Sequence, residues 1–97
     1  MTKSATPRLS AKQIEQIGRA LAEPRRVQLL KQIGAQAEAC PCSNLLETQD
    51  ITPATLSHHL KELENAGLIQ STKHGKNVHL TVERDVLHAY LEQLAKI

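Results

Sequence analysis

The sequence has 97 residues, a formal net charge of +2 and a single aromatic side chain, Tyr90, so it is expected to form one small domain with an aliphatic core. A core of this size favours oligomerisation as a source of further buried area. No apolar run approaches the ~20 residues that a membrane-spanning helix needs, and the first residues lead into no signal-peptide core. We therefore expect a cytoplasmic protein that does not bind membranes, with its two cysteines present as thiols.

The N-terminal third is predicted to contain a flexible arm and two helices. Residues 1–8 show no apolar period and are expected to be the arm, whereas residues 9–97 form the folded domain. Ser10 can cap a first helix, which should end before Pro24 because proline disfavours the α conformation in the residue before it. Pro24 then opens a second helix that ends near Gly34. The inward stripes of the two helices are Ile14, Ile17 and Leu21, and Val27, Leu30 and Ile33.

A short third helix is predicted in the middle of the chain. It is expected to begin near Ser43, after a loop of small residues at 35–39, and to bury Leu45 and Leu46. Residues 49–50 then form a tight turn that leads into the next helix.

The fourth helix has a sharply defined start. Thr52 is a good N-cap because its hydroxyl accepts a backbone N–H that the first turn leaves unpaired, and Pro53 suits the first helical position. Ile51 and Leu56 have the spacing of a hydrophobic staple, which sets the angle at which the chain enters the helix. Gly67 is expected to stop the helix.

The two faces of this fourth helix differ in chemistry. Leu56, Leu60 and Leu63 form an apolar stripe. The opposite face carries short groups and one charge, whereas a helix that only faces solvent usually carries more Glu and Lys. Hydroxyl, methyl and imidazole groups can read base edges in a major groove; the alternative is an amphipathic helix with a mixed solvent face. The residues of this face are Ala54, Thr55, Ser57, His58, Lys61 and Asn65.

After the fourth helix the apolar pattern changes to a period of two, which predicts a β-hairpin. Residues 69–73 and 78–82 alternate in polarity, and residues 73–77 form a basic tip in which Gly75 can supply a positive φ. The last segment, residues 83–97, is predicted to be a helix with a broad apolar face. That face contains Val86, Leu87, Tyr90, Leu91 and Leu94.

Four helices, two strands and a final helix predict a mainly α fold, a winged helix-turn-helix with a two-stranded β wing. The second helix of such a motif enters the major groove of double-stranded DNA. Contacts to phosphates would supply affinity, and contacts to bases would supply part of the specificity. The candidate DNA-contacting residues are Thr52, Ala54, Thr55, Ser57, His58 and Lys61 on the fourth helix, Lys73 and Lys76 on the wing, and Arg25 and Arg26 on the second helix.

Residues 21–30 (LAEPRRVQLL), 54–63 (ATLSHHLKEL) and 66–69 (AGLI), with the basic wing, resemble the ArsR/SmtB family of bacterial winged helix-turn-helix repressors. The resemblance implies a homodimer formed by the first and last helices, an inverted-repeat operator, and an inducer that lowers DNA affinity. The residues also favour a dimer, because their apolar surface exceeds what one small domain can cover. The candidate dimerisation residues are Ile14, Ile17, Leu87, Tyr90, Leu91 and Leu94.

Cys40 and Cys42 lie where the resemblance implies a Cys-x-Cys-Asp-Leu metal-sensing box. Two thiolates at this spacing are a start for a thiophilic metal or metalloid ion, and helix N-terminal amides would lower their pKa. The chain departs from the family pattern, since it has no third cysteine and carries Ser43 and Asn44 in place of the Asp. Structural thiols, a redox switch and a metal site all remain open, and no cofactor is required.

The resemblance also points to a second metal site on the last helix, where Asp85, His88 and Glu92 share one face. The family pattern is incomplete there, and such a face is more often solvated. His58 and His59 are adjacent, so they point about 100° apart on a helix and cannot grip one ion. We expect His58 to contact DNA and His59 to pack within the domain.

The chain is thus predicted to be a DNA-binding transcriptional regulator and not an enzyme, because no Ser-His-Asp arrangement, phosphate-binding loop or catalytic carboxylate pair is evident. Two alternatives use the same fold. One is a thiol-based metal, metalloid or redox sensor that uses Cys40 and Cys42, and the other is a winged-helix module that binds proteins rather than DNA.

Overall fold

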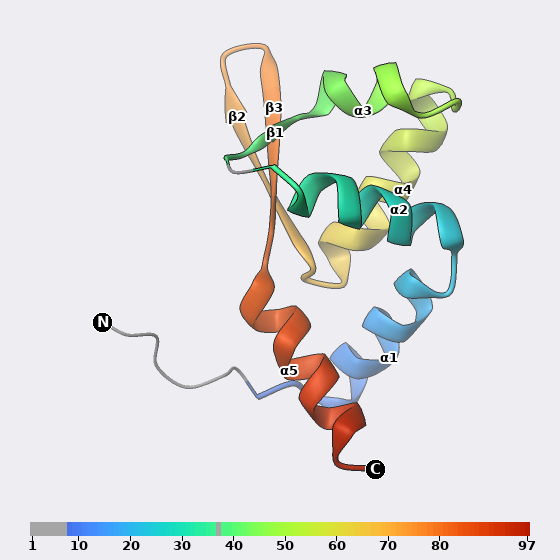
Figure 1. Cartoon of the computed structure of the whole chain (residues 1–97), viewed down its shortest axis with the longest axis vertical. Coiled ribbons are helices and arrows are strands. Elements are labelled where there is room, and N and C mark those ends of the chain that lie inside the picture. The colour runs from blue at the N-terminus through green and yellow to red at the C-terminus, as the bar shows by residue number, and fades with distance from the viewer. Residues whose placement is uncertain (1–7, 37) are drawn as a thin grey trace.

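The computed structural model describes residues 8–36 and 38–97, so the predicted flexible arm lies outside the described residues except for Arg8. The described part is a winged helix-turn-helix domain of five helices and a small antiparallel sheet (Figure 1). The elements are α1 (Ala11–Leu21), α2 (Pro24–Gly34), β1 (Cys40–Pro41), α3 (Cys42–Thr48), α4 (Pro53–Asn65), β2 (Ile69–His74), β3 (Asn77–Val82) and α5 (Arg84–Ala95).

The helix starts lie where the sequence predicts them. The Ser10 hydroxyl accepts the backbone N–H of Gln13 at 3.1 Å, and the Gln13 side chain accepts the backbone N–H of Ser10 at 3.0 Å, which is a capping box. The Thr52 hydroxyl accepts the backbone N–H of Thr55 at 3.1 Å, with Pro53 at the first helical position. Local chemistry therefore defines where α1 and α4 begin.

The end of α4 is a Schellman turn centred on Gly67, whose φ is +81°. The Leu68 backbone N–H donates to the Leu63 carbonyl at 3.0 Å, and the Gly67 N–H donates to the Glu64 carbonyl at 2.9 Å. Leu68 is fully buried, which anchors the chain where it reverses into β2. The glycine thus connects α4 to the β2–β3 hairpin.

The sheet has one more strand than predicted. β2 and β3 form the predicted hairpin, closed by a two-residue turn in which Gly75 has a φ of +66°. The two-residue strand β1 pairs with the other side of β3, so the strand order is β1-β3-β2. Leu80 lies at the centre of this sheet, paired with Cys40 on one side and Ser71 on the other.

The core lies between α1, α2, α3, α4 and the sheet. The side chains that are fully buried there are Ile17, Leu29, Cys40, Leu45, Leu56, Leu63, Leu68 and Leu80. The prediction that α3 buries both Leu45 and Leu46 is wrong for Leu46, which is 37% exposed. Because successive side chains on a helix point about 100° apart, Leu45 faces the core and Leu46 turns outward.

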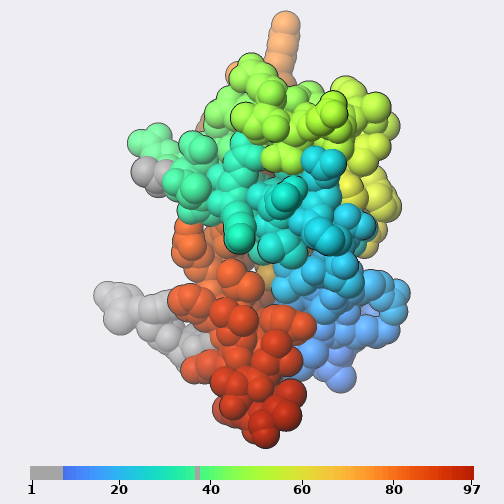
Figure 2. Space-filling model, turned by 45° about the vertical axis from the view of Figure 1, so that its right-hand side comes forward, coloured from blue at the N-terminus to red at the C-terminus, as the bar shows by residue number. Residues whose placement is uncertain are grey.

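The helix-turn-helix and the pair α1 and α5 lie at opposite ends of the molecule. In Figure 1 the wing tip, α3 and the start of α4 lie at the top, and α1 and α5 lie side by side at the bottom. Figure 2, seen from another side, shows the same neighbours at the bottom. The longest extent of the chain is 38 Å, so these two ends are well separated.

We expect Gly67→Ala to destabilise the domain by about 1 kcal/mol, because an alanine at φ +81° is strained. An added Cβ would meet only Val86, at 3.9 Å, so the cost comes from the backbone and not from a clash. Urea unfolding measures this cost. Gly34→Ala is the matched control: it lies in a helix without a positive φ, so it should be neutral or slightly stabilising. Equal effects of the two variants would contradict the backbone explanation.

Candidate nucleic-acid interface

The outer face of α4 is exposed along the residues that the sequence assigns to base contacts. Leu56 and Leu63 are 2% and 0% exposed, and they anchor the helix from behind. The side chains on the opposite side are all exposed, and they are Thr52, Ala54, Thr55, Ser57, His58 and Lys61. The Thr52 hydroxyl already caps the helix and donates to the Thr55 hydroxyl at 3.0 Å. Ser57, His58 and Lys61 have no such hydrogen bond within the described chain, so they are open to a ligand.

Arg26 holds α4 against α2. Its Nε donates to Nδ1 of His59 on α4 at 3.1 Å, and its Nη1 reaches the carbonyls of Arg19 and Ala20 at 3.5 and 3.4 Å. Arg26 was predicted to contact DNA. The structure shows it half-buried with its guanidinium directed into the protein, so it is better described as a residue that positions the recognition helix.

A second polar network connects α2 to the turn of the helix-turn-helix. Arg25 Nη1 donates to Oε1 of Gln49 at 3.0 Å, and Gln49 Nε2 donates to Oε1 of Gln32 at 2.8 Å. Gln32 Nε2 in turn donates to the Thr48 hydroxyl at 2.6 Å. Sequence reasoning missed this network, because glutamines without a motif carry no positional signal. Arg25 is thus half-buried and hydrogen-bonded within the protein, whereas it was predicted to contact DNA.

His59 lies half-buried between these elements, and its Nδ1 accepts the Arg26 hydrogen bond. Burial lowers the pKa of His59, and the neighbouring Arg26 lowers it further, while Glu23 acts in the opposite direction. An unprotonated Nδ1 is what the Arg26 hydrogen bond requires. The ring of exposed His58 lies 5.8 Å from that of His59, and its charge when protonated adds a smaller lowering of the His59 pKa. The two adjacent histidines therefore have separate roles, and the predicted packing of His59 is confirmed.

The wing presents two exposed lysines, Lys73 near the end of β2 and Lys76 in the turn. On the same hairpin the rings of His74 and His79 pack edge to face, with centroids 4.9 Å apart. Among the described residues there is one ion pair, between Arg19 and Glu15 on the surface of α1. Lys61, Lys73 and Lys76 thus have no carboxylate partner there, and they are available to phosphates.

The sequence and the fold are similar to those of known helix-turn-helix proteins. Residues 21–72, from the end of α1 to β2, match the family described as "Helix-turn-helix domain". The arsenical resistance operon repressor of Staphylococcus xylosus is 35% identical over 72 residues, which cover 74% of this chain and 66% of that protein. The CadC homologue of Staphylococcus aureus, a cadmium resistance transcriptional regulatory protein, is 28% identical over 82 residues, which cover 82% of this chain.

The chain belongs to the ArsR family of helix-turn-helix transcriptional regulators. It spans about two thirds of the length of these relatives, 65% in the case of the CadC homologue. A solution structure from Mycobacterium bovis, described as a homodimeric winged helix-turn-helix DNA-binding domain, superposes with a TM-score of 0.70. It is 22% identical and covers 88% of this chain and 79% of that one. The predicted family and its DNA-binding helix-turn-helix are thereby confirmed. The described helices include none that is long and apolar enough to cross a membrane.

The two cysteines of this ArsR-family chain do not form an exposed thiolate pair. Cys40 is fully buried, and its Sγ donates to the Pro41 carbonyl at 3.6 Å, while Cys42 is half-buried at the start of α3. Burial raises the pKa of the Cys40 thiol, and the neighbouring Cys42 raises it further. Burial also raises the pKa of the Cys42 thiol. The expectation that these pKa values are lowered is therefore wrong, because burial of the thiols raises them.

Neither predicted metal site contains three ligands in the described residues. No group of three or more His, Cys, Asp or Glu side chains that could hold an ion occurs there. Asp85, His88 and Glu92 are exposed on α5, as expected for a solvated face. Metal binding by Cys40 and Cys42 stays a prediction, with any further ligand to come from outside this protomer.

The predicted dimerisation residues differ in exposure. Leu91 and Leu94 on α5 are 52% and 45% exposed, and Ile14, Leu87 and Tyr90 are half-buried. The assignment of Ile17 is wrong, because its side chain is 0% exposed in the protomer and has no surface left for a partner. α1 turns Ile17 into the core with Ala20, so the available surface comes mainly from α5.

We expect the free energy of unfolding to depend on pH through His59. Its folded-state pKa is lowered, so as the pH falls below about 6.5 the unfolded chain takes up a proton before the folded chain does. The stability that neutral His59 contributes is complete above that pH and is lost as the pH falls through the folded-state pKa. We expect His59→Gln, which keeps an acceptor for Arg26, to unfold with a shallower pH dependence between pH 7 and 5. His58→Gln, at the exposed neighbour, should retain the steep dependence of the parent, and a matching loss in both variants would refute the assignment.

Proposed function

We propose that the chain is a transcriptional repressor that binds an inverted-repeat operator as a homodimer. The observation that carries this proposal is the outer face of α4, which is exposed from Ala54 to Lys61 while Leu56 and Leu63 fix it from behind. The S. xylosus relative is an operon repressor, which supports the direction of regulation. A repressor of this kind acts by occupying the operator.

In the proposed complex α4 enters the major groove through its N-terminal half. Ser57 and His58 offer hydrogen bonds to base edges, and Ala54 and the Thr55 methyl group offer apolar contact to a thymine methyl. Lys61 lies one turn further along α4, where the groove wall carries phosphates. Lys73 and Lys76 on the wing reach the phosphates beside that groove. The bases would then be read by small groups, and affinity would come from lysines on two separate elements.

The homodimer is proposed to form through α5 and α1, at the end opposite the start of α4. Exposed Leu91 and Leu94 continue the half-buried surface of Leu87 and Tyr90, and water-exposed leucines at this density favour burial against a second copy. The M. bovis domain of the same fold is described as homodimeric. A two-fold axis through α5 would place the two copies of α4 on successive major grooves, about 34 Å apart.

The thiol-sensor alternative receives no support from the position of the cysteines. Cys40 is fully buried, and burial raises the pKa of both thiols, whereas a reactive cysteine has a lowered pKa and an accessible sulfur. The protein-interaction module is disfavoured by membership of a family of DNA-binding regulators.

The DNA proposal is tested by selecting bound duplexes from random sequence and measuring their affinity by fluorescence anisotropy. We expect an inverted repeat to emerge, and we expect His58→Ala to weaken binding to it by roughly fivefold or more, on the order of 1 kcal/mol. His88→Ala, an exposed histidine on α5, is the matched control and should bind as the parent does. If His58→Ala bound the operator with unchanged affinity, the proposal that this face of α4 reads the major groove would be wrong.

The dimer proposal is tested by placing charges on α5. We expect the double variant Leu91→Asp/Leu94→Asp to sediment as a folded monomer, because two carboxylates cannot be buried unpaired in an apolar interface. Its operator affinity should fall steeply, since each copy would bind a half-site alone. Leu46→Asp, at an exposed leucine on α3, should leave the sedimentation of the dimer unchanged. A dimer that persists in the double variant would place the interface elsewhere.

A further inference from the structure

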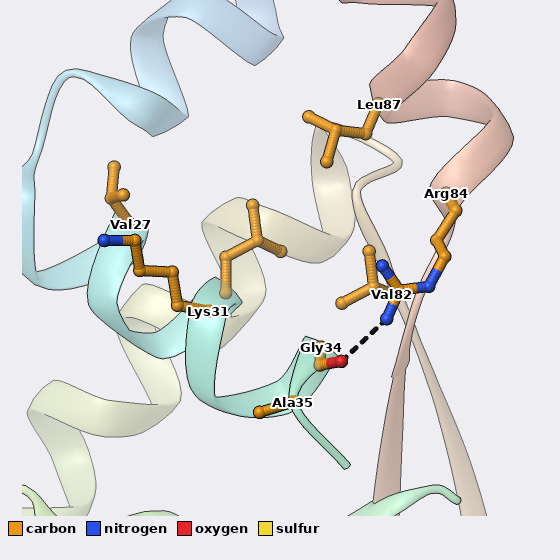
Figure 3. Close-up of a pocket in the computed structure, with 8 residues that line it drawn as sticks. Val27, Lys31, Gly34, Ala35, Val82, Arg84 and Leu87 are labelled. Carbon is orange, nitrogen blue, oxygen red and sulfur yellow. Dashed lines mark hydrogen bonds between the residues drawn. The ribbon is translucent and has the colours of Figure 1, made fainter. Parts of the chain in front are cut away.

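We propose that a cavity between α2, β3 and the start of α5 binds a small monocarboxylate with an apolar body. The cavity has a volume of about 340 Å³, at the low end of the range for small-molecule sites, so it suits one ring or a short alkyl chain. Figure 3 shows its lining residues. They are Val27, Leu30, Lys31, Gly34, Ala35, Val82, Arg84 and Leu87.

The walls of the cavity are apolar and come from three elements. Val27 and Leu30 lie on α2, Val82 ends β3, and Leu87 projects from the first turns of α5 (Figure 3). Gly34 keeps the space open at the base: a Cβ built there would lie 3.5 Å from both Val82 and the Arg84 guanidinium. An apolar body placed between these walls would leave water and contact aliphatic side chains on both sides.

The charge of the cavity is positive only. Lys31 and Arg84 stand on opposite sides of it, on α2 and α5 (Figure 3), and no acidic residue lines it. Within the described residues neither of these two cations has an ion-pair partner. An anion is therefore the ligand that this cavity attracts, and a cationic analogue of the same shape is disfavoured.

Arg84 is already oriented by the protein. Its Nη2 donates to the Gly34 carbonyl at 2.7 Å, at the C-terminal end of α2 (Figure 3). This bond uses one of five guanidinium N–H groups, so a carboxylate can accept from those that remain. Because the carbonyls at a helix C-terminus repel anions, the carboxylate is expected on the side of the guanidinium that faces away from Gly34.

A neighbouring hollow limits the orientation of the ligand. It has a volume of about 250 Å³, shares Val82 and Arg84 with the apolar cavity, and includes Glu38 in its lining. Arg84 thus lies between an apolar cavity and a hollow that contains a carboxylate. A second carboxylate on the ligand would be repelled by Glu38, which favours a monocarboxylate over a dicarboxylate.

The position of the cavity connects a ligand to DNA binding, and this step rests on the proposed function. Its walls join α2, which holds the recognition helix through Arg26 and His59, to α5, which carries the proposed dimer surface. A ligand between them would bind one relative arrangement of α2 and α5 better than others, which is the requirement for an effector. We therefore expect occupancy to change operator affinity.

The test uses octanoate as the probe, with octanol and octylamine as uncharged and cationic analogues. Methyl-labelled full-length protein is titrated without DNA and followed by NMR. Saturable shifts are expected at Leu30, Leu87 and Val27, and none at the distant Leu46. Arg84→Gln should weaken octanoate binding by about tenfold or more, as expected for loss of a charge-assisted hydrogen bond, and should leave the weak binding of octanol unchanged. Lys31→Gln should weaken it less, and Arg19→Gln, at a surface arginine on α1, not at all.

The outcomes separate the site from its regulatory role. No saturable shift, equal binding of octylamine, or full binding to Arg84→Gln would overturn the carboxylate site. Shifts confined to Leu91 and Leu94 would overturn it too, since the probe would then occupy the dimer surface. Octanoate that binds through Arg84 and leaves operator affinity unchanged overturns the regulatory role only. A protein that binds octanoate and no DNA would overturn the proposed function while the site stands.

Discussion

The anchoring of α4 is the constraint on which the rest of this structure depends. A helix that reads bases must present a polar face and still be held rigidly, and here two leucines and one hydrogen bond meet both requirements. Leu56 and Leu63 are buried behind the helix, and the Arg26–His59 bond fixes its flank to α2. Because the polar contact requires an unprotonated histidine, the position of α4 is tied to a group whose pKa is lowered by burial and by Arg26.

The same arrangement explains why α2 is the central element of the domain. On one side it bonds to α4 through Arg26, and along its length Arg25 and Gln32 connect it to the turn after α3. Its other side faces β3 and α5 across the apolar cavity, and Arg84 of α5 donates to the Gly34 carbonyl at the C-terminus of the helix. A shift of α2 would therefore act on the DNA-reading end and on the proposed dimer end together, which is the connection an ArsR-family regulator needs to respond to an effector.

The differences between prediction and structure share one physical origin. A periodic pattern shows that a side chain is apolar or charged, but not which neighbour occupies the space beside it. Ile17 lies on an apolar stripe like Ile14, yet the core takes it completely. Arg26 has the composition of a phosphate contact, yet a histidine acceptor 33 residues away directs it inward. Cys40 follows a metal-site pattern, yet β1 places it in the core, where burial raises its pKa.

The sequence by itself determined what local chemistry controls: the helix starts at Ser10 and Thr52, the reversal at Gly67, the wing hairpin and the polar outer face of α4. Caps, turns and periodic faces are set by neighbours within a few residues, so they can be read without the fold. Only the tertiary structure decided the third strand, the α2 networks and the apolar cavity, because each joins segments that lie far apart in the chain. Those long-range contacts assign the partners of Arg26 and Arg84, and no local pattern contains that information.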